Sequence, residues 1–122
     1  MNTIIKLVCF GLALSSAASF AEDCTAPAAP SLPDGATATL EEMLAGQTAV
    51  KEYQAANAEY RACLEPKVTA AQTAAAGDSP GPELVEALQK LNDDYNVSVS
   101  DEEKVAEEFN TELRQYKEAN PS

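Results

Sequence analysis

The chain of 122 residues contains no histidine. Histidine is the usual general base, the usual metal ligand and the usual pH-sensitive side chain in proteins. Its absence removes the most frequent catalytic arrangements and leaves a zinc site short of ligands. The chain also carries no enzyme motif, so we expect a protein that is not an enzyme, with no catalytic residues, no cofactor and no metal ion.

Long hydrophobic runs are absent as well. The apolar run at residues 7–14 is well short of the ~20 residues that a membrane-spanning helix needs. It follows a short N-terminal stretch with one positive charge and precedes small residues at Ser19 and Ala21, the spacing that signal peptidase reads. This pattern predicts a signal peptide at residues 1–21, a mature chain from Glu22 and no membrane span after cleavage. A retained anchor is the alternative.

Cysteine is rare, with 3 residues in the chain. Cys9 lies in the predicted signal peptide, which leaves Cys24 and Cys63. An even pair in an exported protein favours a disulfide, because the compartment is oxidising. Two free thiols or a metal pair are the alternatives. We therefore expect a Cys24–Cys63 disulfide and a periplasmic or secreted protein.

Basic residues are few, with 8 lysines and arginines against 20 acidic residues. Cleavage would remove one basic residue and no acidic residue, which makes the net charge −13. Such a surface repels nucleic acid and anionic lipid. It would attract a basic partner if charge guides association. The acid clusters lack the loop that tight calcium binding requires, and a solvated helix face explains them better.

The sequence pattern after residue 38 predicts two helices, at about 39–76 and 82–118. Thr39 and Glu42 form a capping-box pattern at the first start, and Gly77 is a natural stop. Pro66 removes one backbone hydrogen bond, so we expect a bend after Leu64 without a new domain. Pro82 suits the first turn of the second helix. Proline and glycine between the two patterns predict the loop of a hairpin.

The second helix carries an apolar seam with heptad spacing, typical of a coiled coil. Residues 96–100 are poor helix formers, and 100–103 could cap a new helix. Because the seam keeps its phase across this stretch, we expect one continuous helix. The seam residues are Leu84, Leu88, Leu91, Tyr95, Val105, Phe109, Leu113 and Tyr116.

Folding the helices back at the loop pairs residues whose numbers sum to about 159, given a short-loop hairpin. This register places Val50 by Phe109, Met43 by Tyr116 and every other apolar position by an apolar one. The polar interruptions also meet, since Asn57 and Arg61 fall opposite Glu102 and Ser98. We interpret these four residues as a structural polar layer that fixes the register.

The segment at 22–38 has a proline period of three. A polyproline II strand through this segment would be ~46 Å long at ~3.1 Å per residue. One edge of this strand would be lined by Cys24, Pro27, Pro30 and Pro33. The helix from residue 39 to 63 spans ~36 Å at ~1.5 Å per residue, so the strand can run back along it and close the disulfide. Its prolines would pack between Tyr53 and Tyr60. A disordered linker is the alternative.

These features resemble small uncharacterised exported proteins of Gram-negative bacteria, through the spacings Cys24 to Pro33, Tyr53 to Tyr60 to Cys63-Leu64, and Phe109-Asn110 to Tyr116. The resemblance implies a compartment and a fold but no catalytic residues. We therefore expect an all-α helical hairpin at 39–120 with a clamped proline strand. It would be a non-catalytic interaction protein of the cell envelope with a protein partner and scope for a homo-oligomer. A periplasmic holdase-type chaperone or stress protein is the alternative.

Overall fold

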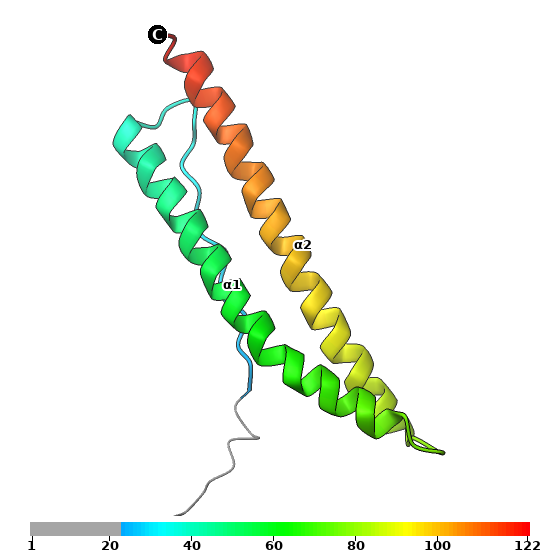
Figure 1. Ribbon diagram of the computed structural model, residues 1–122. Helices are drawn as coiled ribbons and strands as arrows, with labels where there is room; N and C mark the ends of the chain where they lie inside the picture. Colours follow the sequence, from blue (N-terminus) through cyan, green and yellow to red (C-terminus); the bar gives the residue numbers. More distant parts are fainter. Residues whose placement is uncertain (1–22) are drawn as a thin grey trace, which may run out of the picture.

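The computed structural model describes residues 23–122, and the predicted signal peptide at 1–21 lies outside them. Two helices, α1 (Leu40–Ala75) and α2 (Pro82–Ala119), pack against each other as an antiparallel hairpin (Figure 1). The described part of the chain contains no strand. The predicted all-α hairpin is therefore confirmed.

Helix α1 begins with the predicted capping box. The Thr39 hydroxyl accepts from the backbone N–H of Glu42 at 3.2 Å, and the Glu42 carboxylate accepts from the Thr39 N–H at 2.7 Å. The helix continues through Pro66 and changes direction in its second half (Figure 1). It ends where expected, directly before Gly77, with Ala76 as the C-cap in a right-handed conformation. Gly77 has no positive φ and does not form a left-handed cap.

Helix α2 is one continuous helix, as expected. Its N-cap is Gly81, and Pro82 occupies the first position, where a missing N–H costs nothing. The poor helix formers at 96–100 remain helical because the seam continues on both sides and Ser98 is buried within it. At the other end, the backbone N–H and the side-chain amide of Asn120 both donate to the Tyr116 carbonyl.

The hydrophobic core lies at the end of the hairpin away from the loop. Met43, Val50, Tyr53, Val105 and Phe109 form one buried cluster. The partly buried side chains that pack against it are Leu32, Ala38, Leu113 and Tyr116. In the loop-proximal half, the large apolar side chain that is buried is Leu64.

An extended segment at 23–33 runs back along the hairpin (Figure 1). The Cys24–Cys63 disulfide is present, with the two Cα atoms 5.8 Å apart. Every third residue from Cys24 through Pro27 and Pro30 is half-buried, and the residues between them are exposed. The segment therefore turns one edge toward the helices.

A tight turn after this segment contacts α2 as well as α1. The N–H of Gly35 donates to the Glu112 carboxylate at 2.7 Å. A Cβ at Gly35 would lie 1.8 Å from the backbone oxygen of Glu112, so only glycine permits this approach. The expectation of packing on the first helix alone is thus incomplete. The segment lies against both helices because α2 supplies a backbone surface and a carboxylate beside the core.

Candidate interaction surface

The four residues of the polar layer meet between the two helices. Arg61 Nη1 donates to Glu102 Oε2 at 2.6 Å and to Ser98 Oγ at 3.2 Å. Ser98 Oγ in turn donates to Asn57 Oδ1 at 3.1 Å. Asn57 and Arg61 are one turn apart on α1, and Ser98 and Glu102 are one turn apart on α2. The hairpin register therefore follows the sum of about 159.

The polar layer is buried at its centre and reaches solvent at its edge. Asn57 is 2% exposed and Ser98 is 5% exposed. The side chains of Arg61 and Glu102 are 18% and 24% exposed. Asn57 Nδ2 is buried and has no hydrogen-bond partner among residues 23–122. An unpaired buried amide costs stability, so we expect this layer to specify the pairing more than it stabilises the fold.

One side of the hairpin is covered by the extended segment, and we call it the proline side. Pro27, Tyr53 and Tyr60 line one cavity of about 130 Å³ beside the polar layer. Further along, a Cβ at Gly46 would lie 2.7 Å from the Pro33 ring. The half-buried proline edge and the two tyrosines are thus brought together at this side.

Two residues of this packing lay beyond the sequence analysis. Gly46 is seven residues before Tyr53 and lies on the same face of α1, so the heptad spacing could have identified it. The Gly35–Glu112 hydrogen bond joins residues 77 positions apart, and no spacing signal marks it.

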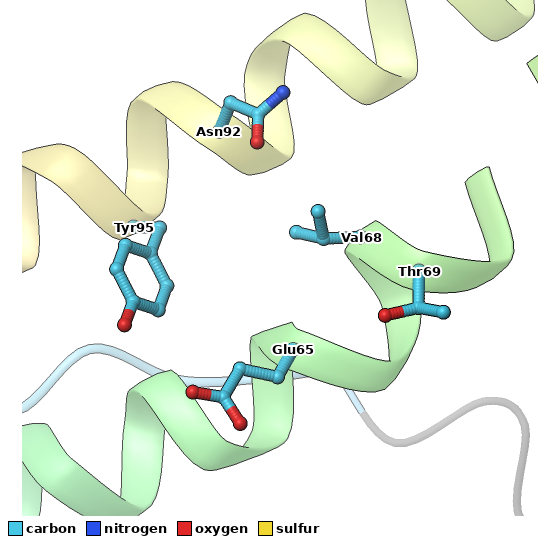
Figure 2. A pocket seen from close by; sticks show the side chains of 5 residues that line it. All are labelled: Glu65, Val68, Thr69, Asn92 and Tyr95. Atoms are coloured by element: carbon cyan, nitrogen blue, oxygen red, sulfur yellow. The ribbon is translucent and has the colours of Figure 1, made fainter. Parts of the chain in front are cut away.

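The opposite side of the hairpin carries an open groove. Its first hollow, of about 340 Å³, lies where Glu65, Val68 and Thr69 of α1 face Asn92 and Tyr95 of α2 (Figure 2). Its second hollow has a volume of about 260 Å³. The second hollow is lined by Gln54, Arg61, Val99, Glu102, Glu103 and Ala106. Both hollows lie on one side because Arg61 precedes Glu65 by one turn, and Tyr95 precedes Val99 by one turn.

Several large exposed apolar side chains share this groove side, spread along its length. Leu40 is 60% exposed, Leu44 is 55% exposed and Val99 is 37% exposed. Leu40 lies three heptads before Arg61, and Leu44 lies three heptads before Glu65, so both share the side of the groove. Val85, two heptads before Val99, is 47% exposed on the same side. Of the five large apolar side chains that are exposed among residues 23–122, only Val97 lies on the proline side.

Acidic side chains, in contrast to the exposed apolar ones, are more prominent on the proline side than on the groove side. Three carboxylates line the open groove, those of Glu65, Glu102 and Glu103, and Glu102 is paired with Arg61. The proline side of α2 instead presents acids at a heptad interval. These acids are Asp94, Asp101 and Glu108, and Glu112 follows them. The open groove is therefore the more apolar and less charged side of an acidic protein.

The polar chemistry of the surface is limited among the described residues. On the proline side, Lys90 donates to Asp94 at 2.7 Å, and this hydrogen bond raises the pKa of the lysine. No three cysteine or acidic side chains of residues 23–122 lie close enough to hold a metal ion. Neither helix contains a stretch that is both long and apolar enough to cross a bilayer.

Comparisons with protein-family models, curated proteins and solved structures found no match. No relative lends a residue role to this chain. The open groove, the proline side and the polar layer are therefore interpreted from their own geometry.

Proposed function

We propose that this is a non-catalytic interaction protein, exported to the periplasm or secreted, whose open groove is the surface that binds a protein partner. The observation that carries the proposal is that four of the five large exposed apolar side chains among residues 23–122 share the groove side. Leu40, Leu44 and Val99 are each more than one-third exposed there. Val99 lines the second hollow of the groove, and an apolar surface rimmed by polar groups is typical of a protein-binding site.

The proline side has a structural role in this proposal. The half-buried edge at every third residue of the segment supports a polyproline II conformation, which has three residues per turn. The disulfide supports an oxidising compartment, as does the signal-peptide pattern of residues 1–21. With its proline side closed, the hairpin offers one open side for a partner.

A photo-cross-linking experiment tests the proposal with a matched pair of positions. Val99 lies on the groove and Val97 lies on the proline side of the same helix, and both are exposed. A photoreactive residue at 99 should form one stoichiometric adduct in the envelope of the native host. The same residue at 97 should not form it.

The contact is then checked by substitution. Val99→Asp should lower the amount of complex recovered at least tenfold, whereas Val97→Asp should leave it unchanged. Equal adducts from both positions, or none from either position, would contradict an interaction surface at the groove.

A holdase-type chaperone is the second candidate, favoured by the thin packing of the loop-proximal half. Leu84, Leu88 and Leu91 are only half-buried there. A holdase should open this half under stress and bind a hydrophobic dye on acidification. An interaction protein with a fixed partner should keep the same dye signal across that pH range.

A further inference from the structure

One strip of α1 on the groove side has a regular composition. It consists of residues at intervals of seven, which share one face of a helix. All of them are exposed. The strip consists of Leu44, Lys51, Ala58, Glu65 and Gln72.

The two charges of this strip are opposite and have no partner within the described chain. Neither Lys51 nor Glu65 takes part in an ion pair or a side-chain hydrogen bond among residues 23–122. Each lies seven residues from Ala58, a distance of ~10.5 Å along the helix axis. The strip is therefore self-complementary in charge about Ala58.

We propose that a second copy of this chain docks on the groove side with its α1 antiparallel and a two-fold axis at Ala58. The proposal rests on the proposed function, because it names the occupant of the same surface. A two-fold axis makes each contact twice, so Lys51 of each copy meets Glu65 of the other. The small side chain of Ala58 lets the two helices approach to ~8 Å at the axis.

The antiparallel orientation of the two α1 helices follows from the charges of Lys51 and Glu65. Parallel helices in register would place Lys51 against Lys51 and Glu65 against Glu65, which is unfavourable. In the antiparallel arrangement both charges find an opposite charge. Leu44 of one copy then lies beside Gln72 of the other, which removes part of an exposed leucine from water.

The charge distribution of the whole surface favours a second copy over a basic partner. A copy that docks on the groove side keeps its Asp94, Asp101 and Glu108 carboxylates on the outer side of the assembly. The repulsion between two acidic proteins is therefore smallest in this orientation. A basic partner would be drawn to the proline side instead, where those carboxylates are.

Charge exchange on the purified, disulfide-bonded protein tests the pairing. Sedimentation equilibrium at low ionic strength should show a dimer, and Lys51→Glu and Glu65→Lys should each raise its dissociation constant by roughly tenfold or more. The double variant should restore the original constant. Lys104→Glu is the control, because it makes the same change of charge on the proline side of α2.

The Glu65→Lys variant separates the pairing from a general charge effect, because it lowers the net negative charge and yet should weaken the dimer. A protein that stays monomeric, or a dimer that ignores both single changes, would overturn the antiparallel pairing. An adduct with another protein from position 99, together with a monomer in the centrifuge, would overturn this inference and leave the proposed function intact. No adduct and no dimer would overturn both.

Discussion

Arg61 and Glu102 form a 2.6 Å ion pair across the hairpin, between residues 41 positions apart. The pair is about one-fifth exposed, and Ser98 and Asn57 extend it into the core. The apolar seam on either side of it is made of similar residues and would tolerate a shift by one heptad. A shifted register would leave Arg61 or Glu102 facing apolar side chains without its partner.

We expect Arg61→Leu alone to destabilise the fold, by about 1–3 kcal/mol, because it leaves Glu102 partly buried and unpaired. Arg61→Leu together with Glu102→Leu should recover or exceed the original stability while permitting mixed helix pairings. Denaturant unfolding gives the stabilities, and light scattering after size exclusion reports the pairings. A neutral single variant and a uniquely paired double variant would show that the ion pair does not fix the register.

The disulfide should contribute stability without contributing helix. It joins cysteines 39 positions apart, for which loop-closure entropy gives a stabilisation of about 4 kcal/mol. Cys24→Ser with Cys63→Ser should lower the melting temperature and keep the circular dichroism of both helices. Unchanged melting would mean that the extended segment contributes nothing to the folded state.

The close approach of the turn to α2 is tested with two glycine substitutions. Gly35→Ala places a methyl group on the Glu112 backbone and should destabilise by about 1–3 kcal/mol. Gly81→Ala is the control, because a Cβ there has open space around it, and the poorer N-cap is largely offset by the lower entropy of the unfolded chain, so the net change should be within about 0.5 kcal/mol. Thermal unfolding of both variants measures the two effects. Equal effects would mean that Gly35 does not lie against the Glu112 backbone.

The docking of Pro33 on α1 predicts that the effect of Gly46→Ala depends on the residue at position 33. Alanine is favoured over glycine inside a helix by about 0.5–1 kcal/mol. At Gly46, however, the new methyl group would displace the Pro33 ring, so Gly46→Ala should destabilise the protein. In a Pro33→Ala background only the 3.2 Å approach to the Phe109 ring remains, so the same change should destabilise less. A Gly46→Ala effect that is the same in both backgrounds would show that the two residues do not touch.

Export should produce a chain that begins at Glu22 and has no reactive thiol. The reason is the Ser19–Ala21 cleavage pattern and the Cys24–Cys63 bond. Intact-mass measurement on exported protein, with an alkylating reagent and no reductant, reads both properties at once. A mass that retains residues 1–21, or alkylation of Cys24 or Cys63, would contradict this prediction.

Much of the fold could be predicted because its signals are local or periodic. The capping box at Thr39 and the first-turn proline at 82 are local patterns. The register follows from matching two heptad seams through a short loop, and it brings Arg61 to Glu102. The disulfide follows from the cysteine count and from the lengths of two regular segments.

The remainder depends on contacts that carry no periodic signal. Gly35 meets Glu112 only because the turn after the proline segment crosses toward α2. The helix ends at Ala76 without a left-handed glycine, and the Gly77 N–H donates to the Ala74 carbonyl at 3.5 Å. The open groove also escaped prediction, since its hollows depend on which side the proline segment leaves uncovered.

The uneven core also determines which part of the hairpin unfolds locally first and which part forms last during folding. The buried cluster joins residues such as Val50 and Phe109, far apart in the chain, whereas the half next to the loop is thinly packed. Local opening therefore begins at the loop, so backbone amides near residues 68 and 91 exchange with deuterium well before those near 50 and 109. During folding, the contacts near the loop close the shortest stretches of chain, but they are also the weakest. The stable contacts are those at the opposite end of the hairpin. The hairpin is therefore stable only after the residues farthest apart in the sequence have come into contact.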